Sequence, residues 1–114
     1  MKTLCKFFSA CVVFLAAMGA SMGASAADLE VHIAIKDHKF EPSEIKVPAQ
    51  QRIKLHIQNQ DATPEEFESH SLKREKVIPG GGKALISIGP LQPGRYTFFG
   101  EFHPATATGV LIAD

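Results

Sequence analysis

Sulfur is confined to the start of this chain. Its two cysteines and three methionines are Cys5, Cys11, Met1, Met18 and Met22. The residues that follow can therefore form no disulfide and can offer a metal ion no soft sulfur ligand. Any metal site in the later part of the chain must be built from nitrogen and oxygen donors.

An excess of charge of one sign is also lacking. The 114 residues hold 12 Lys and Arg against 12 Asp and Glu, and the residues after Ala27 hold 10 basic and 12 acidic side chains. Nucleic-acid binding requires a basic patch, so we predict no nucleic-acid partner. No internal repeat, low-complexity tract or linker interrupts residues 28–114, and their number suits one small domain.

The first 27 residues have the pattern of a cleaved signal peptide. A basic start precedes an apolar stretch at residues 7–20, and Ala24-Ser25-Ala26 supplies an A-x-A cleavage site. A membrane anchor is the alternative, but it needs about 20 apolar residues, and Ser9 interrupts the run. We therefore expect residues 1–27 to be removed, and a domain of residues 28–114 that does not span the membrane and resides in the periplasm.

Apolar and polar residues alternate along most of the remaining chain with the period of β-strands. Turns rich in Gly and Pro separate these stretches, and no segment has a convincing helical period. The pattern predicts an all-β Greek-key β-sandwich of seven to eight strands. Residues 36–43 are predicted to be a polar connection in which Phe40 plugs one end of the core. Residues 72–78 are predicted to be either a helical turn or an irregular strand. Strands are expected at residues 29–35, 44–48, 52–59, 84–88, 95–99 and 109–113.

Three polar residues are interpreted as having no functional role. His32 and His56 fall on the outward faces of their strands, as ordinary surface histidines do. Tyr96 follows a Pro-Gly turn, a position that suits a tyrosine corner, in which the hydroxyl bonds back to a nearby backbone group.

Ionisable residues gather in two later segments. Glu101 and His103 are two residues apart in the loop after residue 99. Three glutamates lie within four positions at residues 65–68, and His70 follows them. Clustered carboxylates repel one another unless a cation or a basic partner offsets them. The alternative for residues 65–69 is an edge strand protected by charge.

We predict a cation site built from carboxylates and imidazole. Alternation places Glu65 on the side of Phe67 and Glu66 on the other, so a buried Phe67 would make Glu65 compete with Glu66 as the inward-facing ligand. The predicted metal ligands are His103, Glu101, Glu66 and Glu41, with Glu65, Glu68 and His70 as weaker candidates.

Three features of the sequence resemble the cupredoxin family. They are Phe40-x-Pro42, Asn59-x-Asp61, and Pro93-Gly94-x-Tyr96-x-Phe98 leading into a His-Pro loop. Together they span almost all of the chain after the leader, and the resemblance implies the cupredoxin sandwich. In blue-copper members the last loop supplies a cysteine, a histidine and often a methionine, and an earlier histidine follows the Asn-x-Asp loop.

This sequence departs from that ligand pattern. The resemblance places Gly100 at the cysteine position, Ala107 near the methionine position, and Glu65 or Glu66 at the earlier histidine position, so His103 alone is retained. Because a blue-copper site needs two histidines and a cysteine, type 1 blue copper is not expected.

Within the family, Glu41-Pro42 and Glu66-Phe67-Glu68 resemble the EfeO-type and stand-alone periplasmic cupredoxin-like proteins of bacterial ferrous-iron uptake systems. The resemblance implies binding of iron (Fe²⁺/Fe³⁺) or copper (Cu²⁺) through carboxylates and one histidine. It also implies partnership with an inner-membrane iron permease and other periplasmic iron-uptake components. The alternatives are a ferroxidase-type enzyme that oxidises Fe²⁺ with copper at the site, and a metal-free periplasmic interaction module.

Overall fold

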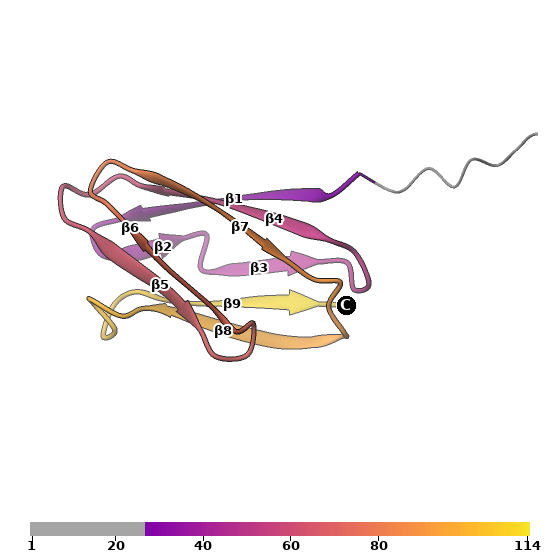
Figure 1. Cartoon of the computed structure of the whole chain (residues 1–114). Helices are drawn as coiled ribbons and strands as arrows, with labels where there is room; N and C mark the ends of the chain where they lie inside the picture. The colour runs from indigo at the N-terminus through magenta and orange to yellow at the C-terminus, as the bar shows by residue number, and fades with distance from the viewer. Residues whose placement is uncertain (1–26) are drawn as a thin grey trace, which may run out of the picture.

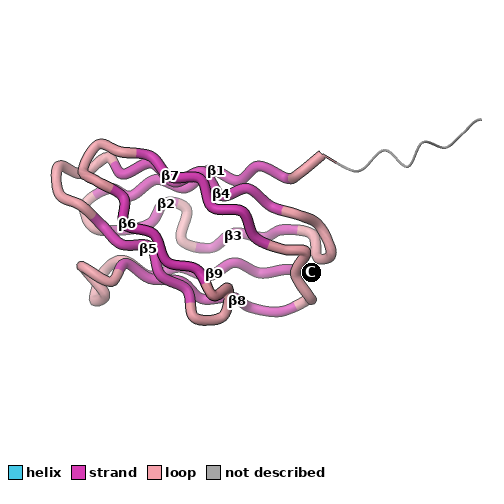
Figure 2. The backbone as a smooth tube through the Cα atoms, viewed as in Figure 1, coloured by secondary structure: helices cyan, strands magenta, loops and turns pink. Residues whose placement is uncertain are grey.

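The computed structural model describes residues 27–114, so the expected signal peptide lies outside the described residues. This part of the chain forms nine strands and no helix (Figures 1 and 2). It consequently holds no helix long and apolar enough to cross a membrane. The strands are β1 (Leu29–Lys36), β2 (Lys39–Glu41), β3 (Glu44–Val47), β4 (Ile53–Asn59), β5 (Glu65–Ser69), β6 (Arg74–Ile78), β7 (Lys83–Ile88), β8 (Gly94–Gly100) and β9 (Thr108–Ala113).

The strands form two sheets that pack face to face as a β-sandwich. One sheet has the order β2-β1-β4-β7 and the other the order β3-β9-β8-β5-β6. Most neighbours are antiparallel, but β1 pairs with β4 and β3 pairs with β9 in parallel. The predicted all-β sandwich is thus confirmed.

The core lies between the sheets because alternate residues of each strand point inward. In β4, for example, Ile53, Leu55 and Ile57 are each at most 1% exposed. Phe40 contacts Phe67 and Phe98 edge-on, with ring centroids 6.1 and 5.0 Å apart. These aromatic pairs anchor the core at the end of the sandwich where the ionisable residues gather.

One detail of the strand assignment differs from the sequence prediction, and the structure decides two alternatives that the sequence leaves open. Residues 36–43 are not a plain connection, because they contain the short strand β2, which brings the count to nine. The ambiguous residues 72–78 hold β6 and no helical turn. The acidic strand β5 is not an edge strand, because it lies between β8 and β6.

Tyr96 forms the predicted tyrosine corner. Its hydroxyl donates a 2.7 Å hydrogen bond to the backbone carbonyl of Gln92. This bond ties the start of β8 to the preceding turn, so the structural interpretation of Tyr96 is confirmed.

Candidate metal centre

Three connecting segments meet at one end of the sandwich, on the left in Figure 1. They are the β1–β2 turn, the junction of the β4–β5 loop with β5, and the β8–β9 loop. They bring together His38, Glu65 and His103, whose potential ligand atoms lie within 4.8 Å of one another. We call these three residues the metal centre. Glu65 and His103 are among the residues predicted from the sequence, and His38 is not.

Glu65 is the buried member of the metal centre. It is the first residue of β5, its side chain faces inward as Phe67 does, and it is 1% exposed. Its Oε1 accepts hydrogen bonds from the backbone N–H groups of Glu66 (3.0 Å) and Phe102 (2.9 Å), and its Oε2 lies 2.6 Å from Nδ1 of His103. A buried carboxylate is costly unless it is paired and hydrogen-bonded, and here both oxygens are engaged. Of the two alternatives that the sequence leaves open, Glu65 rather than Glu66 faces His103.

His103 is held by a tight backbone turn in the β8–β9 loop. Its N–H donates to the carbonyl oxygen of Gly100 at 3.1 Å, and its own carbonyl oxygen accepts from the N–H groups of Thr106 and Ala107. The imidazole stacks on that of His38, with centroids 3.6 Å apart and planes inclined at 18°. The contacts with Glu65 and His38 hold the ring in place. Because the side chain is 30% exposed, the ring still reaches solvent.

His38 comes from the turn between β1 and β2. Asp37 and His38 both have positive φ, 53° and 56°, as the central residues of a type I′ hairpin turn do. The carboxylate of Asp61 accepts hydrogen bonds from the N–H groups of both residues, at 2.8 and 3.0 Å. The hydroxyl of Thr106 donates to the carbonyl oxygen of His38 at 2.7 Å. The backbone of His38 is therefore held from two other loops.

The sequence does carry a signal for this turn. Asp and His are among the non-glycine residues most often found at positive φ, and here they stand together between Lys36 and Lys39. Because β2 has only three residues, its alternation is too short to reveal the hairpin. A search for two-residue turns would have located the turn that carries His38, but not its contact with Glu65 and His103.

Asn59 and Asp61, one of the pairs that carries the family resemblance, brace this end of the molecule. The buried amide of Asn59 donates to the carbonyl oxygens of Thr63 and Ile78, and its Oδ1 accepts from the N–H of Asp61. Hydrogen bonds from the N–H of His38 and then that of Asp37 hold the pKa of Asp61 below its ordinary value of 3.8, although burial opposes them. The motif therefore positions the turn that carries His38.

Asp61→Asn is expected to lower the free energy of unfolding at neutral pH by about 1–2 kcal/mol. The amide offers one oxygen acceptor where the carboxylate offers two. Because the folded-state pKa is lowered, the stabilisation is present above the unfolded-state pKa and is lost as the pH falls through the folded-state pKa. The difference between parent and variant should therefore shrink below pH 3.8. Urea unfolding measured at neutral pH and under acid would show this, and a difference that stays constant would contradict it.

Most of the other predicted ligands lie elsewhere. Glu66 and Glu68 alternate with Glu65 and so face away from the core, where they form an acidic cluster with Glu75. Glu101 adjoins this cluster. Desolvation, followed by the carboxyl groups of Glu101 and Glu66, raises the pKa of Glu68. The structure thus separates these carboxylates from the metal centre by the thickness of a strand.

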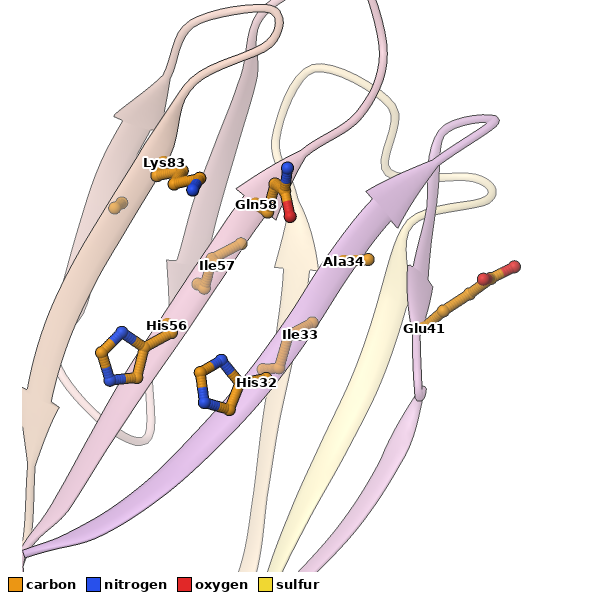
Figure 3. Close-up of a pocket in the computed structure, with 9 residues that line it drawn as sticks. His32, Ile33, Ala34, Glu41, His56, Ile57, Gln58 and Lys83 are labelled. Carbon is orange, nitrogen blue, oxygen red and sulfur yellow. The ribbon is translucent and has the colours of Figure 1, made fainter.

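Glu41 and His70 also lie apart from the metal centre. Glu41 is on the outer face of the four-stranded sheet, and Figure 3 shows its side chain pointing away from the neighbouring strands. His70 has a side chain that is 80% exposed, and its Nε2 is 3.9 Å from Oε1 of Glu68. His70 therefore approaches the acidic cluster.

Gly100 shows why a copper–thiolate site does not fit here. A Cβ atom on Gly100 would lie 2.6 Å from Cδ of Glu65 and 2.7 Å from Cβ of Ala107. The carboxylate of Glu65 fills the space that a side chain at residue 100 would need, and the described residues contain neither cysteine nor methionine. The residues present do not fit a type 1 blue-copper site, which takes two histidines and a cysteine.

The fold and these residues can be compared with known proteins. A family model described as Cupredoxin-like domain matches residues 9–113. The chain belongs to this family. An uncharacterized protein of Rickettsia prowazekii (strain Madrid E), RP394, is 44% identical over 110 residues, which cover 91% of this chain and 88% of the relative.

Two solved cupredoxin-like structures share the fold at low sequence identity. Auracyanin A, a "blue" copper protein from Chloroflexus aurantiacus, has a TM-score of 0.67 at 12% identity, covering 77% of this chain and 100% of that chain. The metal binding domain of the Cu(I) exporting P-type ATPase CopA of Streptococcus pneumoniae D39, solved with Cu(I), has a TM-score of 0.67 at 13% identity, covering 75% and 84%. The predicted cupredoxin membership is confirmed, and the narrower resemblance to EfeO-type proteins stays a prediction.

Proposed function

We propose that this cupredoxin-like protein binds a divalent transition-metal ion, Fe²⁺ or Cu²⁺, at His38, Glu65 and His103. The convergence of two imidazoles and a buried carboxylate from three separate segments, with ligand atoms within 4.8 Å, carries the proposal. Two imidazoles and one carboxylate suit Fe²⁺ and Cu²⁺ better than Cu⁺, which prefers sulfur. Compared with the ligand set predicted from the sequence, this set retains His103 and a carboxylate, that of Glu65, and adds His38 as a second histidine.

The surroundings of the two rings support a ligand role. Nδ1 of His103 lies 2.6 Å from Glu65 and Nδ1 of His38 lies 3.5 Å from Asp61. Metal-binding histidines commonly have a carboxylate beside one ring nitrogen, which orients the ring and raises its basicity. Two rings stacked 3.6 Å apart would repel each other if both were protonated, whereas one shared cation would favour both neutral rings. Both side chains are partly exposed, 30% and 41%, so an ion has access.

Glu65 has two ways to act on the ion. Its Oε2 can bind the metal directly, or it can hold Nδ1 of His103 and leave Nε2 as the ligand. Glu65→Gln separates these modes, because an amide oxygen can still accept the two backbone N–H groups but carries no charge. A loss of affinity as large as that of His103→Gln favours direct binding, and a smaller loss favours the orienting role.

Metal titration of the purified protein tests the proposal. In the full chain, Cys5→Ser and Cys11→Ser remove the only thiolates that could compete for the metal. Paramagnetic Cu²⁺ should then broaden the NMR signals of the His38 and His103 rings. His38→Gln and His103→Gln are each expected to weaken the binding of Cu²⁺, and of Fe²⁺ without oxygen, by roughly tenfold or more. His70→Gln is the matched control, because His70 lies outside the metal centre. Binding weaker than roughly millimolar, or affinities unchanged in both ring variants, would contradict the proposal.

We propose that the protein is exported to the periplasm. There it would act as an accessory protein of iron uptake, together with an inner-membrane iron permease. The signal-peptide pattern of residues 1–27 supports export. The resemblance of Glu41-Pro42 and Glu66-Phe67-Glu68 to EfeO-type proteins supports the iron role. N-terminal sequencing of the periplasmic fraction should find a chain that begins at Ala27 or Asp28. Growth that stays normal under iron limitation when the gene is deleted would contradict the iron role.

A further inference from the structure

The outer face of the four-stranded sheet carries two histidines whose sequence positions are typical of ordinary surface residues. His32 on β1 and His56 on β4 lie opposite each other in the parallel register of these strands. Their rings stack with centroids 4.6 Å apart and planes inclined at 15°. Figure 3 shows both rings projecting from adjacent strands on the same side of the sheet.

A carboxylate completes this group. Glu30 precedes His32 by two residues, so both side chains leave β1 on the same face. Its Oε1 is 3.3 Å from Nε2 of His56. One potential ligand atom from each of Glu30, His32 and His56 lies within 4.8 Å of the other two.

One nitrogen in this group is not accounted for by the protein alone. Nε2 of His56 is buried and has no hydrogen-bond partner, although the ring as a whole is 35% exposed. The nearby Glu30 oxygen does not make a hydrogen bond with it. A buried polar atom without a partner costs free energy, and such atoms in native structures call for a missing water or ion.

Space for additional ligands adjoins the two rings. A hollow of about 300 Å³ lies along the same face, lined by His32, His56, the small side chain of Ala34 and, at its far end, Lys83. An ion between the rings and Glu30 could therefore keep open positions filled by water.

We propose that Glu30, His32 and His56 form a second site for a divalent transition-metal ion of the Zn²⁺ class. Two imidazoles and one carboxylate with an open position are a common Zn²⁺ ligand set. The site is separate from the metal centre, because His32 lies on the outer face of β1 and four residues of extended strand, about 13 Å, separate it from the end of β1. His38 lies beyond that end, in the turn to β2. It therefore stands whether or not the metal centre binds an ion.

Zn²⁺ titration of the purified protein carrying Cys5→Ser and Cys11→Ser tests this proposal. His38→Gln is expected to weaken Zn²⁺ binding at the metal centre, so a background that carries this substitution lets Zn²⁺ binding at the second site be followed separately. NMR should show the ring-nitrogen signals of His32 and His56 shifting together with one equivalent of Zn²⁺. His32→Gln and His56→Gln should each lower the affinity of the second site for Zn²⁺ at least about tenfold, and Glu30→Gln should also lower it.

The matched control is again His70→Gln, which removes an exposed histidine near a carboxylate without a second imidazole beside it. It should leave the affinity of the second site for Zn²⁺ unchanged. The proposal is overturned if the His32 and His56 signals do not move up to roughly millimolar Zn²⁺, or if His32→Gln binds as tightly as the parent. Proton–deuterium exchange and thermal unfolding of each variant establish that a loss of binding is not a loss of fold.

Discussion

Glu65→Ala is expected to lower the free energy of unfolding by about 2–4 kcal/mol, because each backbone N–H left without its acceptor costs about 1–3 kcal/mol when it is shielded from water. The carboxylate accepts hydrogen bonds from two backbone N–H groups, those of Glu66 and Phe102, and pairs with His103. Alanine would leave both N–H groups without their acceptor at a site that is 1% exposed. Urea unfolding followed by circular dichroism measures the change.

Glu66→Ala is the matched control for this prediction. It removes the same side chain one residue later, where the strand turns it to the outer face, so a change within about 0.5 kcal/mol is expected. Similar losses in the two variants would show that burial of Glu65 does not stabilise the fold as we argue. Glu65→Gln should fall between them, since it keeps one acceptor oxygen.

Gly100→Ala is expected to destabilise the protein by about 1–3 kcal/mol, the usual cost of overpacking a filled interior. The added methyl group would lie 2.6 Å from Cδ of Glu65 and 2.7 Å from Cβ of Ala107. Because Glu65 must then shift from His103, the affinity of the metal centre should fall as well. Thermal unfolding and Cu²⁺ titration measure the two effects.

Gly94→Ala provides the comparison on the same strand, β8. A Cβ atom there meets nothing closer than 3.8 Å, so little change is expected. Adding Ala107→Gly to Gly100→Ala removes one of the two clashes and should recover part of the stability. If Gly100→Ala is as stable as the parent and binds metal equally well, the close packing around Glu65 is not needed for the site.

The sandwich could be predicted from the sequence because its strands alternate cleanly and end at Gly and Pro turns. Two single residues could also be placed from the sequence. A local Pro-Gly motif predicts the tyrosine corner of Tyr96, and the apolar side chain of Phe40 predicts its burial in the core. Strand β2 was harder to predict, because three residues give alternation too little length to be recognised.

The metal centre could be predicted only in part. Glu65 faces inward because Phe67 does, a relation that alternation makes visible in the sequence. That His103 would meet the side chain of Glu65, and not the side chain of Glu101 two residues earlier, depends on the path of a loop. His38 joins them through a hairpin turn that a carboxylate from a third loop holds, and no local pattern encodes such a contact.

The pairing of His32 with His56 lies beyond sequence reasoning for a different reason. Each histidine alone looks like an ordinary outward side chain, and their proximity depends on the parallel register of β1 and β4. Parallel neighbours are not linked by a hairpin, so the chain gives no local signal of the pair.

The position of β9 has a consequence for the order in which the molecule can form. This last strand lies between β3 and β8, pairing in parallel with one and antiparallel with the other. A chain that extends only to the β8–β9 loop already contains all three residues of the metal centre but lacks the strand that joins β3 to β8. Such distant pairings form slowly. The second sheet is therefore complete only once β9 has inserted between β3 and β8.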